Sequence, residues 1–234
     1  MAETLSIPSR FNGPLDSGNG GYSSGVVAGF LDGAAEVSLR SPVPLDTELA
    51  VSREGDGSVR ILDGELLVAE ARAEPDFALE VPDPVSPGEA RQAMAGYRGE
   101  SGGLFSRCFV CGLDREDGLG VFAGAVDGRE LVASTWTPPG WTADGRGRVR
   151  PEYVWAVLDC PAYFALYKDR EMPVSMLARF TVRIEAPVPA GEENVVISWP
   201  IEIDRRKHHA GSAVLSADGR TLAVARALLI EPKN

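Results

Sequence analysis

The stretch Arg150–Leu166, RPEYVWAVLDCPAYFAL, is almost entirely apolar after Glu152, and a single carboxylate, Asp159, stands in its middle. The apolar residues 153–158 are consecutive, so in a helix they surround the axis instead of forming one stripe. Because a surface helix has one apolar and one polar face, this pattern predicts a helix that is buried on most sides. A carboxylate inside such a helix is costly unless it has partners or a chemical task, so Asp159 is the first candidate functional residue.

The segments after this helix predict a sheet that covers it. Four stretches rich in β-branched residues alternate with turn residues, as they do in an antiparallel sheet. These predicted strands are Leu177–Ala186, Asn194–Ile203, His209–Ser216 and Thr221–Ile230. An antiparallel sheet of this size can curl round one central helix, so the sequence predicts an α+β fold.

The N-terminal part of the chain has the same order of elements. A helix is predicted at Tyr22–Leu31, where the apolar residues fall largely on one side, and Asp32-Gly33 is a stop signal. Four strands are predicted after it, at Glu36–Ser41, Glu48–Arg53, Ser58–Leu62 and Glu65–Ala73. Helix followed by four strands therefore occurs twice in the chain.

A segment rich in Pro and Gly separates the two parts. Four prolines interrupt regular structure between residues 74 and 103, apart from a short polar piece at Ala90–Tyr97. Beyond it, Leu119–Ala125 and Glu130–Trp136 are predicted strands that precede the central helix. The sequence thus predicts an N-terminal unit at 1–80, a linker at 81–104 and a C-terminal unit at 105–234.

Two short matches indicate that the two units are copies. VSLRSPVP (Val37–Pro44) aligns with VRIEAPVP (Val182–Pro189), and LLVAEARAE (Leu66–Glu74) resembles TLAVARALLIE (Thr221–Glu231). Each match is short, but both occur in the same order after a helix of comparable type. We interpret them as an internal duplication.

Composition excludes several classes of function. The chain has 234 residues, of which 44% are hydrophobic, as expected for a globular protein with a sizeable core. Its 23 Lys and Arg against 34 Asp and Glu leave a net charge of −11, so nucleic acid is not an expected partner. No segment approaches the roughly 20 apolar residues of a membrane helix, and no secretory leader is recognisable. With only three cysteines, a cytoplasmic location without a membrane partner is expected.

A helix wrapped by a curved antiparallel sheet and present twice in one chain resembles the double hotdog fold of the acyl-CoA thioesterase-like superfamily. In hotdog thioesterases of the His-Gly-Gly type, a Gly-Gly pair begins the helix and its amides receive the thioester carbonyl. An acidic residue follows about two turns later. Asn19-Gly20-Gly21 resembles the first part of this motif.

The same template places Asp159 at the acidic position of the second helix. Pro151 and Glu152 stand there in place of the two glycines, and Ala28 stands where the first helix should have its acid. Each helix thus keeps what the other lacks. The resemblance implies a tandem hotdog with two central helices, each wrapped by a curved antiparallel sheet.

The resemblance also implies one composite site between the two helices. Gly20 and Gly21 would supply amide donors at a helix N-terminus, which complements the oxyanion that develops on a thioester carbonyl. Asp159 would attack the carbonyl or activate a water, and burial would raise its pKa towards neutrality. Asn19, Tyr22 and Trp155 would contact the substrate.

Other interpretations of these residues stay open. A Gly-Gly pair before a helix is common in loops. Asp159 precedes Cys160-Pro161, where it could accept bonds from backbone groups freed by a kink. Aligning FLD at 30–32 with VLD at 157–159 would make Asp32, and not Ala28, the counterpart of Asp159. We prefer the register set by the Gly-Gly pair.

Cysteine and histidine suggest little further chemistry. Cys108-Phe-Val-Cys111-Gly112 has the spacing of a zinc knuckle, and Cys160 or His208 could add a ligand, but a second Cys-x-x-Cys is missing. We expect the cysteines to pack the start of the second unit, and elemental analysis to find no stoichiometric zinc. His208 and His209 are adjacent in a predicted strand and would face opposite ways, which does not suit a histidine-based hydratase or hydrolase.

Two classes of function remain. The first is an acyl-CoA thioesterase or related hydrolase whose partner is an acyl-CoA or another acyl thioester, with no cofactor and no metal. Arg148 and Arg150, which lead into the central helix, would then bind the phosphates of coenzyme A, although solvated loop charges are the default for such residues. The second class is a non-catalytic hotdog module that binds an acyl chain, an acyl-CoA or a protein partner. A fold supports many functions, and a homo-oligomer is compatible with either class.

Overall fold

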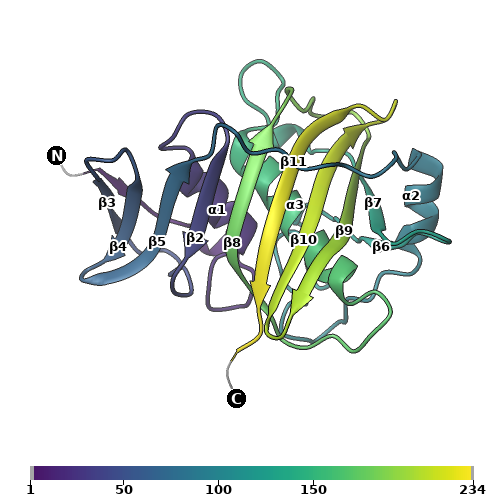
Figure 1. Ribbon diagram of the computed structural model, residues 1–234, viewed down its shortest axis with the longest axis horizontal. Helices are drawn as coiled ribbons and strands as arrows, with labels where there is room; N and C mark the ends of the chain where they lie inside the picture. Colours follow the sequence, from purple (N-terminus) through teal and green to yellow (C-terminus); the bar gives the residue numbers. More distant parts are fainter. Residues whose placement is uncertain (1–2, 233–234) are drawn as a thin grey trace.

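The computed structural model describes residues 3–232, and a single sheet of eleven strands forms its centre (Figure 1). The strands are β1 (Thr4–Leu5), β2 (Ala35–Leu39), β3 (Leu49–Arg53), β4 (Val59–Asp63), β5 (Leu66–Ala73), β6 (Gly124–Ala125), β7 (Val132–Trp136), β8 (Met176–Ile184), β9 (Asn194–Asp204), β10 (Lys207–Ser216) and β11 (Thr221–Ile230). The described residues also form three α-helices, α1 (Gly20–Ala28), α2 (Pro87–Met94) and α3 (Pro151–Leu166), and 3-10 turns at Ser9–Phe11 and Gly140–Thr142.

Two groups of strands make up the sheet, and both have the same internal order. The N-terminal group follows α1 and is ordered β3-β4-β5-β2, and the C-terminal group follows α3 and is ordered β9-β10-β11-β8. The groups meet where β2 pairs with β8, from Ala35 opposite Val182 to Ser38 opposite Arg179. Every pairing between these strands is antiparallel. The predicted α+β class is therefore confirmed.

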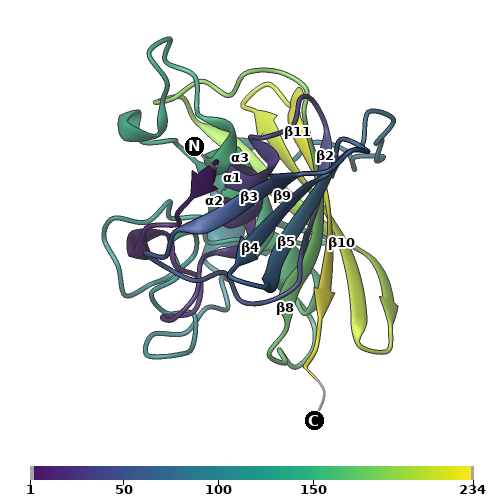
Figure 2. The same cartoon turned by 90° about the vertical axis from the view of Figure 1, so that its left-hand side faces the viewer.

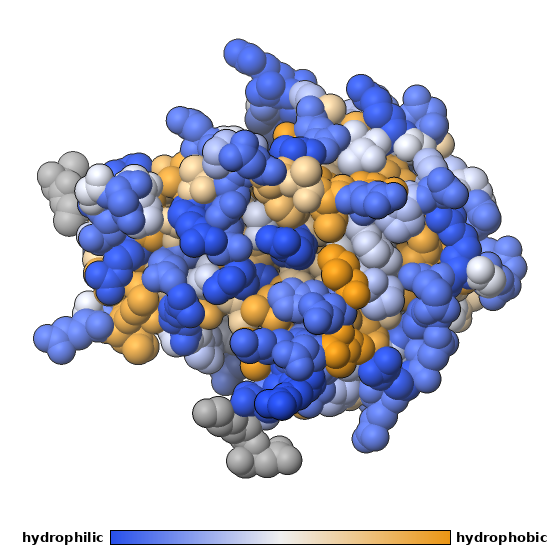
Figure 3. Space-filling view, viewed as in Figure 1, coloured by the Kyte–Doolittle hydropathy of each residue, from blue (hydrophilic) through white to orange (hydrophobic). Residues whose placement is uncertain are grey.

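Helices α1 and α3 lie side by side on one side of the sheet, which curves round them (Figures 1 and 2). As predicted, α3 is buried on most sides, and Val154 and Val157 are 1% and 0% exposed. The opposite face of the sheet carries mainly hydrophilic side chains with apolar ones among them (Figure 3), as expected for an antiparallel sheet with one solvated face. None of the helices in residues 3–232 has the length and apolar content needed to cross a bilayer.

Two glycines allow α1 to approach α3 closely. A Cβ at Gly21 would lie 2.5 Å from Asp159 Cβ, and a Cβ at Gly25 would lie 2.7 Å from Glu152 Cα. Optimal separations between carbon atoms are about 3.5–4.0 Å, so neither position accepts a side chain unless the helices move apart. Because Gly25 follows Gly21 while Glu152 precedes Asp159, the two helices run antiparallel at this contact.

Helix α1 begins at Gly20, before the predicted start at Tyr22. The reason is the side chain of Asn19, which accepts a hydrogen bond from the Tyr22 amide and so caps the first turn. The helix ends at Ala28, earlier than the predicted Leu31.

The predicted strand at 119–125 is the largest difference from the expected elements. Only Gly124–Ala125 joins the sheet, as β6. The amides of Leu119 and Val121 donate instead to the carbonyls of Phe109 and Val110, at 2.8 and 3.0 Å. This segment therefore pairs with the loop that carries Cys108 and Cys111.

The segment predicted as a linker is packed and not free. It contains α2, which begins with a capping box between Ser86 and Glu89. Ala90 and Ala93 of this helix are buried in a cluster with Leu131, and the cluster continues into β9 and β10. The chain between the two groups of strands is thus part of the fold.

We expect Gly25→Ala to lower the free energy of unfolding by about 1–3 kcal/mol, the usual cost of overpacking a core. The loss should occur although alanine forms helices better than glycine by about 1 kcal/mol. The control is Gly55→Ala, because a Cβ at Gly55 would meet no atom within 4 Å. This variant should change stability by less than about 0.5 kcal/mol. Urea denaturation followed by circular dichroism measures both, and equal effects would contradict the close helix contact.

Candidate active site

The N-terminus of α1 presents its first turn to a cavity. Asn19 is buried, and its side-chain oxygen accepts a hydrogen bond from Tyr22 N at 2.8 Å. Gly21 N donates to Oδ2 of Asp159, also at 2.8 Å. Gly20 N has no hydrogen-bond partner among residues 3–232, and Gly20 lines the cavity. One amide of this helix end is therefore still available to a ligand.

Asp159 lies in the middle of α3 and is 8% exposed. Burial raises its pKa to about 7, while the hydrogen bond from Gly21 opposes the rise and the nearby Cys108 thiol adds to it. Near neutral pH the carboxyl group is therefore partly protonated and partly ionised, a state that suits a general base. The hydrogen bond between Gly21 and Asp159 joins α1 to α3, and both residues were predicted from the sequence to belong to the site.

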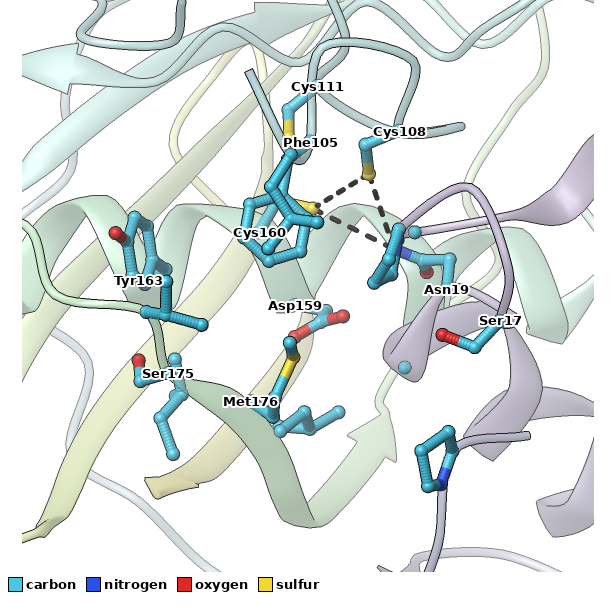
Figure 4. A pocket seen from close by; sticks show the side chains of 18 of the residues that line it. Ser17, Asn19, Phe105, Cys108, Cys111, Asp159, Cys160, Tyr163, Ser175 and Met176 are labelled. Carbon is cyan, nitrogen blue, oxygen red and sulfur yellow. Dashed lines mark hydrogen bonds between the residues drawn. The ribbon is translucent and has the colours of Figure 1, made fainter. Parts of the chain in front are cut away.

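A cavity of about 1070 Å³ opens beside this pair (Figure 4). Apolar side chains from several elements line most of it. They include Leu39, Val43, Phe105, Phe164, Met172, Leu177 and Leu229. Among the lining residues, Asp159 is the only buried carboxylate. An apolar pocket with a few polar groups is the usual form of a small-molecule site.

The structure places both residues that were considered as the counterpart of Asp159, Asp32 and Ala28, at the C-terminal end of α1 or beyond it. Asp32 lies beyond the end of α1 and is exposed. Gly21 faces Asp159, and Gly25 faces Glu152 and Trp155. Helix α1 itself, from Gly20 to Ala28, holds no Asp or Glu and so contributes no acid.

The other predicted substrate contacts lie outside the cavity. The ring of Tyr22 stacks on Phe11 with centroids 4.0 Å apart, and Trp155 packs edge to face on Phe180 at 5.6 Å. Arg148 is exposed and pairs with Asp144 at 2.7 Å, and the Arg150 guanidinium lies over the ring of Tyr153. None of these four predicted residues lines the cavity, whereas Asn19, Gly20 and Asp159 do.

Sequence reasoning missed most of the cavity wall. Residues 97–106 and 171–175 contribute to it, but both are irregular in sequence and carry no periodic pattern. The lining cations are Arg40 and Arg98. Arg40 pairs with Glu70, and Arg98 donates to the Tyr167 carbonyl beyond the end of α3. Cys108, Cys111 and Cys160 also line the cavity, and the Cys-x-x-Cys motif and the position of Cys160 beside Asp159 were the available signals.

Comparisons with known proteins give matches in structure only. No family model and no curated protein matches the sequence. A conserved protein of unknown function with a hot dog fold from Alicyclobacillus acidocaldarius gives a TM-score of 0.64 at 12% identity, covering 99% of this chain and 93% of that one. A tesB protein from Mycobacterium avium subspecies paratuberculosis gives 0.61 at 12%, covering 98% and 91%. A thioesterase superfamily protein gives 0.50 at 19%, covering 55% of this chain and 62% of that one.

Two of these matches extend over almost the whole chain, and the third spans less than two thirds of the protein it matches. At such low identities the likeness concerns the fold. Activity has to be argued from the site itself, because one fold supports many functions.

We expect Asn19→Ala to lower the free energy of unfolding by about 1 kcal/mol, the usual cost of losing a helix N-cap. Asn19→Ser keeps a capping oxygen and should lose much less. Denaturation curves of the two variants beside the wild type measure the difference. Equal stabilities for the alanine and serine variants would show that the cap is not what holds the start of α1.

Proposed function

We propose that this chain, which has the hotdog fold, hydrolyses acyl thioesters at a single composite site between α1 and α3. The observation that supports this most directly is the hydrogen bond from Gly21 N to Asp159, which places an acid beside the open end of a helix. Gly20 and Asp159 line the same cavity, so a ligand there can contact both. An oxyanion donor and a base within reach of one carbonyl are what acyl transfer needs.

The Gly20 amide would receive the thioester oxygen. It is the amide of the first turn without a partner among the described residues, and the positive end of the helix dipole adds to its effect on an anion. The Gly21 amide has a different role from the one predicted, because it already holds Asp159. Charge that develops on the carbonyl oxygen would thus be stabilised by one aligned amide and the dipole of α1.

Asp159 would supply the nucleophile or the base. In its ionised form it either attacks the thioester carbon, with the thiolate leaving and water then cleaving the anhydride, or takes a proton from a water that attacks. Its pKa of about 7 leaves an ionised fraction at neutral pH. The hydrogen bond from Gly21 keeps the carboxylate in one place for this step.

The substrate class follows from the cavity wall. Phe105, Phe164 and Leu177 make it suitable for an apolar acyl group. Arg148 and Arg150 lie away from the cavity, so they are not part of the proposed binding site for the thiol-bearing carrier. Arg40 and Arg98 already have partners, so the carrier phosphates of an acyl-CoA would remain at the mouth or in solvent.

A duplication explains why there is one site and not two. The two strand groups have the same order after their helices, which supports a tandem hotdog with boundaries near 1–80 and 105–234. At the reciprocal position α3 begins with Pro151, which has no amide hydrogen, and Ala28 replaces the acid. Aromatic rings of Phe11, Tyr22 and Tyr153 pack together on that side.

We expect Asp159→Asn to reduce thioester hydrolysis by about 10²–10⁴-fold, the contribution of a positioned base, with folding retained. The amide is nearly isosteric, and removal of a buried ionisable group does not threaten stability. The measurement is thiol release from a panel of acyl-CoA esters of different chain length. Ala28→Ser, at the reciprocal position, is the matched control and should keep wild-type turnover.

The outcomes separate the rival interpretations. An Asp159→Asn protein that is destabilised but fully active per folded molecule would mean that Asp159 is structural. A wild-type protein that hydrolyses none of the thioesters, yet retains an acyl ligand in the cavity, would favour the non-catalytic binding module.

Gly20→Ala is the better test of the amide donor than a Gly21 variant. A side chain at Gly21 would push the helices apart, whereas a Cβ at Gly20 would lie 3.0 Å from Leu177 Cβ and 3.2 Å from Asp159 Oδ2, at the cavity wall. We expect it to lower kcat/KM by up to about 10²-fold, since a misplacement of about 1 Å can cost that much. Steady-state kinetics with one acyl-CoA measures the loss, and unchanged kinetics would remove Gly20 from the site.

A further inference from the structure

The three cysteines of the chain meet at the cavity wall. The Sγ atoms of Cys108, Cys111 and Cys160 all lie within 4.8 Å of one another. Cys108 and Cys111 are buried and Cys160 is partly buried. Figure 4 shows Cys108, Cys160 and Asn19 converging beside Asp159. The proposed hydrolysis uses none of these sulfurs, so the cluster needs an explanation of its own.

We propose that Cys108, Cys111 and Cys160 bind one Zn²⁺ ion, with a fourth coordination position that faces the cavity. A zinc–sulfur bond of about 2.3 Å in a tetrahedral site separates neighbouring sulfurs by about 3.8 Å. The Sγ atoms of Cys108 and Cys160 lie 3.7 Å apart. This distance matches the edge of such a tetrahedron, and it is well beyond a disulfide bond.

The loop that carries two of the ligands has the form of a metal knuckle. Gly112 N donates to the Cys108 carbonyl at 2.9 Å, and a Cβ at Gly112 would lie 2.6 Å from Cys108 N, so the turn requires glycine here. Asn19 Nδ2 is 3.6 Å from Cys108 Sγ. An N–H donor beside a sulfur favours the thiolate, which is the form that binds metal.

Other contacts hold the three sulfurs in place. The Tyr97 hydroxyl donates to the Cys111 carbonyl at 2.6 Å. Segment 119–121 pairs with the knuckle through the Phe109 and Val110 carbonyls. Cys160 belongs to α3, whose position is set by the core. The site is thus built from a loop and a helix that are fixed independently of any ion.

The fourth position is left to a ligand from the cavity. Among the described residues, no further His, Cys, Asp or Glu joins the cluster. His208, which the sequence offered as a ligand, is buried elsewhere against the Tyr167 hydroxyl and the Arg205 carbonyl. All three cysteines line the cavity, so water or a thiol can complete the tetrahedron. Three thiolates select a soft or borderline ion, and the Cys108–Cys160 spacing fits Zn²⁺.

This proposal reverses the expectation drawn from the sequence that no stoichiometric zinc is present. That expectation rested on the missing second Cys-x-x-Cys pair. The third ligand comes from Cys160, 52 positions after Cys108 and on a different element. The ion would tie the wall of the cavity to α3 immediately beside Asp159.

The test is the metal content of protein purified under reducing conditions without chelator, measured by inductively coupled plasma mass spectrometry. We expect one zinc per chain. Cys111→Ser and Cys160→Ser should each lower the zinc content at least about tenfold. Ser41→Ala, which changes another residue of the cavity wall, should leave it unchanged.

A second measurement does not depend on the folding of variants. Wild-type protein stripped by a chelator is titrated with Co²⁺, which should give the intense visible bands of a tetrahedral thiolate site at one equivalent. Absence of zinc together with absence of these bands would overturn the proposal. Neither readout involves hydrolysis, so an inactive protein with one zinc would refute only the proposed function.

Discussion

The close contact between α1 and α3 is the constraint on which the site depends. Gly21 and Gly25 have no side chains to separate the helices, so the Gly21 amide comes within 2.8 Å of the Asp159 carboxylate. The same contact takes Asp159 out of water, which raises its pKa, and supplies the hydrogen bond that makes its burial tolerable. One feature of backbone packing thus sets the position, the environment and the partner of the candidate catalytic group.

The two sides of this helix pair are chemically different. On one side the contact opens into an apolar cavity that holds Asp159, Gly20 and the three sulfurs. On the other side, Pro151 begins α3 and aromatic rings around Tyr153 fill the space. The sheet has nearly the same order in both halves, so the difference between the sides comes from side chains and not from topology.

Helices, strands and buried positions could be predicted from patterns that repeat along the sequence. Contacts between loops that are distant in the sequence could not be predicted. The unbroken apolar run round Asp159 predicted its burial, and the alternation of β-branched and turn residues predicted most strands. The Gly-Gly pair located the helix end that faces Asp159. Arg148 and Arg150 looked like substrate cations because they precede a helix, but a local turn holds Arg148 against Asp144 and leaves Arg150 over Tyr153. Cys160 was only one of two possible further ligands in the sequence, beside His208, because nothing in a spacing of 52 residues indicates that it lies near Cys108.

The bond between Gly21 and Asp159 spans 138 positions of the chain. Contacts of such high sequence separation are slow to form, because closing a long loop costs conformational entropy before the contact contributes any stabilising free energy. Helix α1 has nine residues, too few for an isolated helix to be stable in water. During synthesis it emerges long before α3, and its glycine-lined face has no partner until the ribosome has passed residue 166. The site consequently cannot form before α3 has been synthesised.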